Sequence, residues 1–409
     1  MTNLTLTLTD MAHGGYALGR DKDGRPIFVP YTIPGETASV TLTNEKRSYA
    51  HARLDTLIDP SPDRVDPVCA HFGQCGGCHL QHIAYERQLV LKQAIVEDQL
   101  QRIGGFKEAN VQPVLPNPAP YGHSMDLVLS PTEEGGLGLW SPVAEAVIPI
   151  SQCPIAVEPL VALLQDFDMD LPELRKLTLR LGDDGELLAA FEVEDVEPPE
   201  LVVDFPVSVA IVLPDQTAAS LIGDHYIVRQ VKERDFRVSP GCFFQPNSAA
   251  AGLVVDTVLR YADLHQTELV LDGYSGVGVL AAFLAEAAAE VVAIEQNPDA
   301  VADATVNLDH TDNVRLYQGD VDIILPTLDL PFDVAVLHPP SSGLSREVLD
   351  AIKANPPARL VYLNAELTML ARDGKQLAKL GYRLAEVQPV DMAPQTFQIE
   401  TVSLWVNEA

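Results

Sequence analysis

The chain has 409 residues, too many for one ordinary hydrophobic core, so two or three domains are expected. Hydrophobic residues make up 47% and charged residues 21%, as in globular proteins, and no apolar run reaches the roughly eighteen residues that a transmembrane helix needs. The net charge of −31 excludes a nucleic-acid partner bound over the whole surface, because phosphate binding rests on basic side chains. Such a partner would need a local patch.

The negative charge is unevenly distributed. Residues 154–207 carry three basic and fourteen acidic side chains, whereas residues 1–60 carry six basic and seven acidic ones. The N-terminus has no basic region followed by a hydrophobic one, so no secretory signal is expected. We therefore expect a cytoplasmic protein without a membrane partner, and we expect a monomer.

The first sixty residues predict a small β-barrel. Residues 4–8 alternate Leu with Thr, and further apolar runs at 27–29 and 38–42 are separated by glycine turns. Five short strands with tight turns are typical of an oligonucleotide-binding type of barrel. Residues 46–53 mix basic and aromatic side chains, as in proteins that bind single-stranded nucleic acid, although an ordinary amphipathic strand has the same pattern.

A cysteine cluster follows a proline-rich linker. Cys69, Cys75 and Cys78 lie within ten residues, and Cys153 is the candidate for a fourth ligand. Four thiolates suit either tetrahedral zinc or an iron–sulfur cluster. A triplet with one distant cysteine, rather than two short pairs, favours a [4Fe–4S] cluster, although histidines within residues 71–82 leave zinc open.

The remaining chain divides into a mixed middle and an alternating C-terminal part. In the middle we expect a helix over 85–103 and strands over 126–129, 177–181, 187–191 and 207–212. From about residue 250 helices and strands alternate, which predicts a parallel sheet flanked by helices. The expected strands are 268–272, 291–295, 314–317, 334–337, 360–363, 382–390 and 401–406, and the expected helices are 249–262, 298–308, 345–354 and 368–380.

A glycine-rich turn predicts a ligand site. The strand that ends at Asp272 leads through Tyr274, Gly276 and Gly278 into a helix, and the two glycines let the backbone approach a ligand closely. No third spaced glycine completes a dinucleotide fingerprint, and no phosphate loop is present. A nucleoside cofactor without phosphates, such as S-adenosylmethionine, fits this pattern; the alternative is a turn without a ligand.

Two carboxylates follow the next strands of the expected sheet. Glu295 ends the second strand, where a carboxylate accepts both hydroxyls of a ribose. Asp320 ends the third strand and is placed to meet the adenine. Because parallel strands end at one edge of a sheet, both side chains are expected beside the glycine turn.

These segments together resemble the uracil-C5 RNA methyltransferase family over nearly the whole chain. Residues 29–36 resemble part of its TRAM domain, and the four cysteines match the ligands of its iron–sulfur cluster. Residues 243–247, Phe-Phe-Gln-Pro-Asn, resemble the stretch before the catalytic core, in which the glutamine, here Gln245, contacts the cofactor. The resemblance implies an S-adenosylmethionine-dependent enzyme that modifies rRNA or tRNA.

The resemblance also implies a covalent mechanism whose nucleophile is missing here. Uracil C5 is a weak nucleophile, and in this family a cysteine thiolate adds to C6 before methyl transfer. The matching position is Ala365, whereas the matching base is present as Glu400. The family's aspartate before two prolines is replaced by His338, so we predict that the usual C5 route is lost. His338 is a candidate base for N- or O-methylation, or a structural histidine.

We therefore expect an α/β multidomain protein. It comprises a TRAM-like β-barrel over residues 1–60, a central α/β domain with the iron–sulfur site over 61–235, and a Rossmann-like methyltransferase domain over 236–409. Cys242 is either a replacement nucleophile or a small buried thiol. The alternative function is a non-catalytic relative that binds RNA or carries the cluster.

Overall fold

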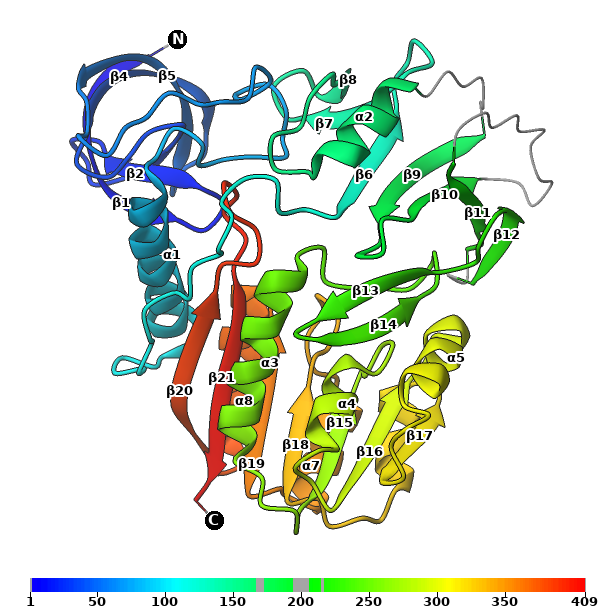
Figure 1. Cartoon of the computed structure of the whole chain (residues 1–409). Helices are drawn as coiled ribbons and strands as arrows, with labels where there is room; N and C mark the ends of the chain where they lie inside the picture. Colours follow the sequence, from blue (N-terminus) through cyan, green and yellow to red (C-terminus); the bar gives the residue numbers. More distant parts are fainter. Residues whose placement is uncertain (1, 167–172, 194–205, 215–216, 409) are drawn as a thin grey trace.

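A computed structural model describes residues 2–166, 173–193, 206–214 and 217–408 of the chain. It contains a small barrel, a central sheet and a larger C-terminal sheet covered by helices, as Figure 1 shows. The acidic stretch over 154–207 lies partly outside the described residues. Among the described helices, none is long and apolar enough to cross a bilayer.

The N-terminal strands close into the predicted barrel. Alternate side chains such as Leu6, Leu8 and Ile27 point inward and are buried, because a strand turns every second side chain to the same face. The strands pair in the order β1-β2-β3-β5-β4. They are β1 (Asn3–Ala12), β2 (Tyr16–Arg20), β3 (Pro26–Pro30), β4 (Thr37–Glu45) and β5 (Ala50–Asp59).

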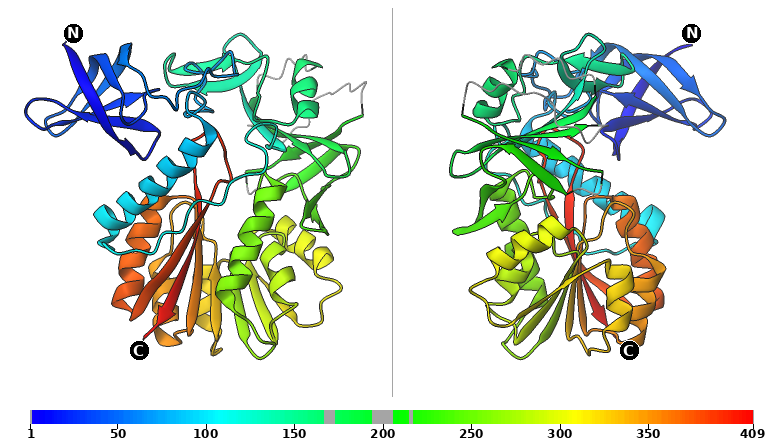
Figure 2. Two further views of the ribbon diagram at one scale, coloured as in Figure 1. Left: turned by 60° about the vertical axis from the view of Figure 1, so that its left-hand side comes forward. Right: turned by 90° about the vertical axis from the view of Figure 1, so that its right-hand side faces the viewer.

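The helix predicted over 85–103 forms as α1 (Tyr85–Gln99) and continues as a short π-helix, η1 (Leu100–Gly104). Gly105 ends it with a φ of 80°, a left-handed conformation that suits glycine. The helix lies beside the C-terminal strands β20 (Tyr382–Val390) and β21 (Glu400–Asn407), as Figure 2 shows. The segment η1 contacts the C-terminal helix α8 (Leu367–Lys379). The helix therefore connects the cysteine segment to the C-terminal part.

The central part is a seven-stranded sheet with one covering helix and a separate hairpin. The four strands predicted here form, whereas β7, β8, β12, the hairpin and α2 were not predicted. The sheet order is β12-β11-β10-β9-β6-β7-β8. The elements are β6 (Asp126–Pro131), β7 (Leu137–Ser141), β8 (Ala146–Pro149), α2 (Glu158–Asp166), β9 (Leu174–Leu181), β10 (Leu187–Val193), β11 (Ser208–Val212), β12 (Ala218–Ile222), β13 (Ile227–Val231) and β14 (Arg234–Val238).

The C-terminal sheet has seven strands in the order β17-β16-β15-β18-β19-β21-β20. The expectation of a parallel sheet is wrong for one strand, because β21 is antiparallel to both neighbours. A short loop joins β20 to β21, and such a connection reverses the chain. The strands are β15 (Leu269–Gly273), β16 (Glu290–Glu295), β17 (Val314–Gln318), β18 (Val334–Leu337), β19 (Arg359–Asn364), β20 (Tyr382–Val390) and β21 (Glu400–Asn407).

Helices cover both faces of this sheet (Figures 1 and 2). One face packs against α3 (Ser248–Ala262), α4 (Val279–Leu284) and α5 (Pro298–Asn307). The opposite face packs against α1, α7 (Arg346–Ala354) and α8, with α6 (Val321–Ile324) and η2 (Leu325–Thr327) nearby. The carboxyl ends of β15, β16, β17, β18 and β19 meet at one edge, and the residues predicted to bind the cofactor lie at or after these ends, except Gln245, which precedes α3.

Candidate cofactor and catalytic site

The glycine turn after β15 is held in a conformation that requires its glycines. Gly276 and Gly278 have φ angles of 55° and 87°, and a Cβ at Gly278 would lie 3.1 Å from a side-chain carbon of Leu308. The backbone N–H of Gly276 donates to Oε2 of Glu295 at 2.9 Å. The turn and the end of β16 are therefore fixed to each other.

A pocket of about 90 Å³ opens beside this turn. Four of the predicted site residues, Gln245, Tyr274, Gly276 and His338, line it together. Its floor is apolar and comes from α3, α4 and β19, and the side chain of Phe243 stands at its mouth with 68% of its surface exposed. The pocket thus combines a narrow polar rim with an apolar interior, as small-molecule sites do.

Two buried polar side chains at the turn have no partner within the described chain. Both carboxylate oxygens of Asp272 and the hydroxyl of Ser275 are buried without a hydrogen bond. Burial raises the pKa of Asp272 to about 7; the backbone N–H of Ala281 opposes this rise, and the nearby carboxylate of Glu295 adds to it. Buried polar groups are normally satisfied, and Ser275 lines the pocket, so its hydroxyl is available to a ligand, whereas Asp272 does not line the pocket.

The two carboxylates expected to meet the nucleoside differ in their positions. Glu295 accepts from Gly276 and from the N–H of Asn297, and each of its oxygens retains a free lone pair. Asp320 caps α6 by accepting from the N–H of Asp322, and it does not line the pocket. Asp322 in turn accepts from the Tyr274 hydroxyl at 3.4 Å. Because Tyr274 lines the pocket, this hydrogen bond connects the turn that contains Asp320 to the pocket.

Glu400 and His338 form the polar centre beyond the pocket. Oε1 of Glu400 is buried without a hydrogen-bond partner and lies 4.0 Å from Nε2 of His338. Burial raises the pKa of Glu400 to about 7, whereas a hydrogen bond from Gln245 opposes this rise. Burial lowers the pKa of His338 to about 4. Near neutral pH the pair therefore consists of a neutral imidazole and a carboxyl group close to its midpoint.

Neither candidate thiol position supplies a nucleophile. Ala365 follows β19 at the same edge of the sheet and is exposed. Cys242 is buried, and burial together with the carboxylate of Asp303 raises the pKa of its thiol far above neutral pH. Cys242 is therefore the buried thiol of the two alternatives.

The four cysteines predicted to bind a cluster line one cavity of about 400 Å³. Burial raises the pKa of Cys75, Cys153 and, to about 12, Cys78. Within the described part of the chain, no three His, Cys, Asp or Glu side chains lie close enough together to hold a single metal ion.

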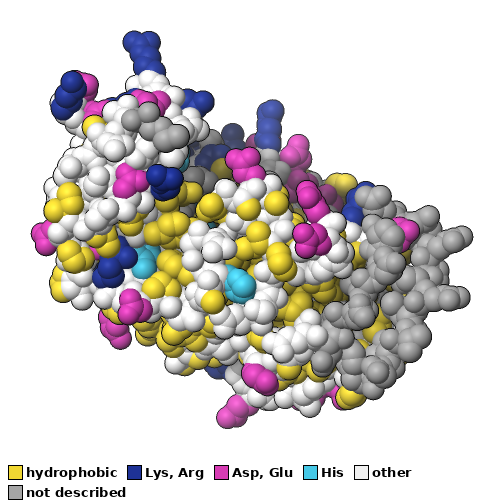
Figure 3. Space-filling model, turned by 90° about the horizontal axis from the view of Figure 1, so that it is seen from above, with side chains coloured by type: hydrophobic (Ala, Val, Ile, Leu, Met, Phe, Trp, Pro, Cys, Tyr) yellow, Lys and Arg dark blue, Asp and Glu magenta, His cyan; other side chains and the backbone are white. Residues whose placement is uncertain are grey.

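The barrel carries the basic and aromatic strip predicted over residues 46–53. The ring of His51 contacts Phe28, Tyr49 and Tyr16 with centroids 5.3 to 5.7 Å apart, and Arg47 beside them is exposed. Figure 3 looks down on the end of the molecule that carries the barrel. Lys and Arg are interspersed there with Asp and Glu, and hydrophobic side chains occupy the middle. The strip is therefore a local feature rather than part of a broad positive surface.

Sequence reasoning missed three features of the site. The unpartnered hydroxyl of Ser275 lies inside the glycine-rich turn, but the sequence of the turn does not indicate that this side chain is buried without a hydrogen bond. The exposure of Phe243 was not predictable from its place in an apolar run. A buried ion pair between Lys92 and Asp391 joins segments 299 residues apart. The sequence contains one indication of it, because Lys92 lies between Leu91 and the apolar pair Ile95 and Val96 on the buried face of α1.

A seven-stranded sheet with one antiparallel strand and a pocket at its glycine turn defines the class of S-adenosylmethionine-dependent methyltransferases. The TRAM domain family matches residues 2–54. The chain is 32% identical to an RNA methyltransferase of Nostoc sp., covering 98% of this chain and 96% of that one. It is also 32% identical to an RNA methyltransferase of Bacillus cereus, with 99% and 96% covered.

The fold also matches a solved structure over its full length. The tRNA (uracil-54, C5)-methyltransferase of Pyrococcus abyssi, in complex with S-adenosyl-L-homocysteine, aligns with a TM-score of 0.76 at 25% identity. The alignment covers 98% of this chain and 100% of that one. The chain belongs to the family of RNA uracil-C5 methyltransferases.

Proposed function

We propose that this protein transfers a methyl group from S-adenosylmethionine to a nucleophilic atom of an RNA base, without a thiol adduct. The observation that carries the proposal is the unpartnered, buried carboxylate oxygen of Glu400, which lies 4.0 Å from His338 of the pocket lining. We propose further that the protein acts as a monomer in the cytoplasm, on rRNA or tRNA.

The residues around the pocket fit S-adenosylmethionine. The cofactor supplies an electrophilic methyl group on a sulfonium. Gly276 permits close approach of the cofactor to the backbone, and Glu295 has free lone pairs for the ribose hydroxyls. Asp320 would face the adenine, because its neighbour Asp322 accepts from the hydroxyl of Tyr274 in the pocket lining. The unpartnered carboxylate of Asp272 offers a buried negative charge to the positively charged amino-acid end.

Glu400 is suited to remove a proton during methyl transfer. When a base nitrogen attacks, the N–C bond forms as the C–S bond breaks, and the proton on the nitrogen passes to the carboxylate of Glu400. A pKa of about 7 makes this group a balanced base near neutral pH. His338 has a pKa of about 4, so it stays neutral at this pH and is a weaker base than Glu400.

Two surfaces support an RNA substrate. The exposed ring of Phe243 lies edge-on to His338, with centroids 6.4 Å apart, and offers a stacking face for a base at the pocket mouth. The aromatic strip around His51 on the barrel offers a second stacking surface beside Arg47. Stacking contacts with bases need fewer positive charges on the protein surface than contacts with phosphate groups do.

The usual uracil-C5 route lacks its first step here, since Ala365 has no nucleophilic atom and Cys242 is buried with a raised pKa. This departure also favours a second candidate function, a relative that binds RNA without catalysis. Cofactor binding separates the two. The buried, unpartnered polar atoms at the glycine turn have no role in a protein that binds no cofactor.

We propose that the four cysteines hold a [4Fe–4S] cluster. Thiols grouped around a cavity of about 400 Å³ suit a cluster better than one zinc ion, and the N–H of Gly77 donates to the sulfur of Cys75 at 3.3 Å. When bound, such a group would crosslink Cys153 of the central part to the segment before α1. A colourless, iron-free protein with one zinc after anaerobic purification would contradict this assignment.

Calorimetry with S-adenosylmethionine and trapping with 5-fluorouracil RNA test the function together. We expect cofactor binding and no covalent RNA adduct. Absence of binding would favour the non-catalytic relative, and an adduct would refute the proposed route. The variant Ala365→Cys restores a thiol at the position of the family's nucleophile. Formation of 5-methyluridine by this variant would indicate that the thiol is the one part of the C5-methylating site that is missing.

A further inference from the structure

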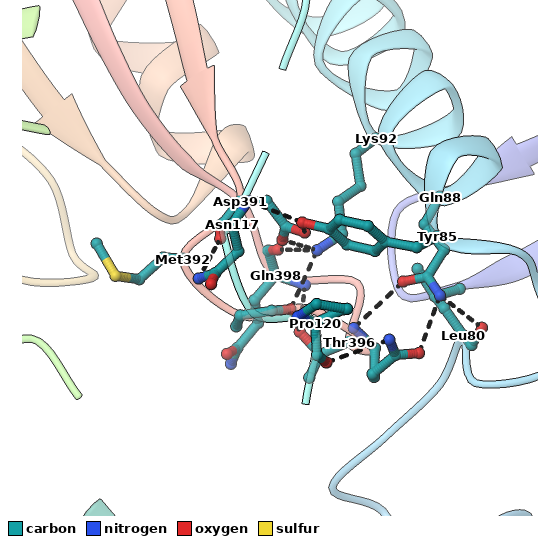
Figure 4. A network of polar contacts seen from close by, with 12 residues as sticks. Leu80, Tyr85, Gln88, Lys92, Asn117, Pro120, Asp391, Met392, Thr396 and Gln398 are labelled. Carbon is teal, nitrogen blue, oxygen red and sulfur yellow. Dashed lines mark hydrogen bonds and ion pairs between the residues drawn. The ribbon is translucent and has the colours of Figure 1, made fainter. Parts of the chain in front are cut away.

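The loop between β20 and β21 carries Glu400 and is fastened to helix α1. It runs from Asp391 to Ile399, and Glu400 follows it as the first residue of β21. Figure 4 shows side chains of α1 pointing into this loop from the side opposite Met392. The loop has little regular structure of its own, so these contacts fix its path.

Lys92 makes the central contact. Its side chain is completely buried, and Nζ donates to Oδ1 of Asp391 at 2.5 Å and to the carbonyl oxygens of Ala393 at 3.1 Å and Gln398 at 2.9 Å. A lysine ammonium has three N–H bonds, and all three are used. One side chain thereby holds the beginning, the middle and the end of the loop.

Tyr85, about two helical turns before Lys92 on α1, completes the coordination of Asp391. Its hydroxyl donates to Oδ2 of Asp391 at 2.8 Å and accepts from the N–H of Asn117 at 2.8 Å. The amide of Asn117 donates to the Asp391 carbonyl at 3.3 Å. Both carboxylate oxygens of Asp391 thus have a donor, and the ion pair is satisfied without water.

Gln88 makes the second attachment and connects the loop to the cysteine segment. Its amide N–H donates to Oε1 of Gln395 at 2.9 Å, and its Oε1 accepts from the Gln395 backbone N–H at 3.2 Å. The carbonyl of Gln395 accepts from the N–H groups of His79 and Leu80, both at 2.9 Å. These two residues directly follow Cys78, so the loop is bound to the cysteine segment through adjacent peptide groups.

We infer that Lys92 and Gln88 are positioning residues that hold Glu400 against His338 and so couple the cysteine segment to the catalytic centre. An isolated buried ion pair contributes little net stability, and an apolar pair of similar volume often replaces it at no cost. The three contacts of Lys92, with one carboxylate and two carbonyl oxygens, instead specify one path for the loop. The inference rests on the proposed function only in that Glu400 is taken as the proton acceptor.

The double variant Lys92→Met/Asp391→Asn tests this role, because it removes both charges and leaves neither buried alone. The matched control is Arg102→Met/Asp98→Asn, which removes an exposed ion pair between α1 and η1. Hydrogen–deuterium exchange of residues 393–399 is measured in the full chain, beside binding of S-adenosyl-L-homocysteine and methyl transfer.

We expect exchange over 393–399 to rise at least tenfold in the double variant, while α8 and the control variant stay unchanged. Cofactor affinity should remain within twofold, and kcat should fall at least tenfold without a matching change in KM. Unchanged exchange in the loop, or an equal rise throughout α1 and α8, would overturn the inference. The exchange result is obtained even if the protein proves to have no methyltransferase activity, so the two failures are distinguishable.

Discussion

Replacing Glu400 by Gln should stabilise the protein at alkaline pH. The Glu400 side chain is 5% exposed, and its unpartnered Oε1 lies 4.0 Å from the neutral imidazole of His338. The ionised form therefore costs free energy in the folded state. Gln has the same shape, carries no charge and retains the contact with Gln245, so the substitution removes this cost without leaving a cavity.

The magnitude follows from the pKa of Glu400, which is about 7 in the folded chain against an ordinary value of 4.5. Below pH 4.5 both the folded and the unfolded states hold the proton. Between these values only the folded state holds it, so the stability of the wild type falls as pH rises through this window. Above pH 7 the full cost is about 3 kcal/mol, from about 1.4 kcal/mol per pKa unit. The variant avoids this loss.

The assay is urea unfolding at pH 4, 6 and 8, followed by the fluorescence of Trp405. This residue is completely buried on β21, the strand that begins with Glu400, and Trp140→Phe removes the other tryptophan. We expect equal free energies of unfolding at pH 4 and an advantage of about 2–3 kcal/mol for the variant at pH 8. An advantage that is the same at all three pH values would refute the reasoning, as would a destabilised variant at pH 8.

Three further substitutions test other parts of the site. Asp272→Asn should weaken S-adenosyl-L-homocysteine binding at least tenfold in calorimetry, whereas the exposed control Asp312→Asn should not. The affinity of the wild type should rise between pH 6 and 8, because the carboxyl group of Asp272 loses its proton in this range. Arg64→Ala removes the bidentate partner of Glu36, whose side chain is completely buried, and should cost about 3 kcal/mol of unfolding free energy, visible as faster amide exchange in the barrel. Cys78→Ser should abolish iron incorporation under anaerobic conditions while leaving cofactor binding in place; full iron content would contradict its assignment as a ligand.

Local patterns predicted most of the regular structure. The period-two alternation of the barrel and the alternating helices and strands after residue 250 are confirmed by the observed elements. The missed strands, such as β8 and β14, are four or five residues long and have too few positions to establish a period. The antiparallel direction of β21 was missed because hydrophobic periodicity carries no information on strand direction.

The site was predictable where its residues belong to recognisable motifs or strand ends, and not where it depends on contacts between distant segments without a motif. Tyr274, Gly276 and His338 follow strand ends and line one pocket with Gln245, which only the family resemblance had indicated. The cofactor and catalytic roles assigned to them remain predictions. The contact between Lys92 and the Glu400 loop depends on α1 folding across the C-terminal sheet, which no local motif encodes.

The most direct test of the proposed reaction is incubation of the anaerobically purified protein with methyl-labelled S-adenosylmethionine and total RNA, followed by mass spectrometry of the nucleosides. We predict label in a base methylated at a nitrogen or exocyclic atom, and loss of that label in the Glu400→Gln variant. Label in 5-methyluridine would contradict the account, and so would RNA that remains unlabelled.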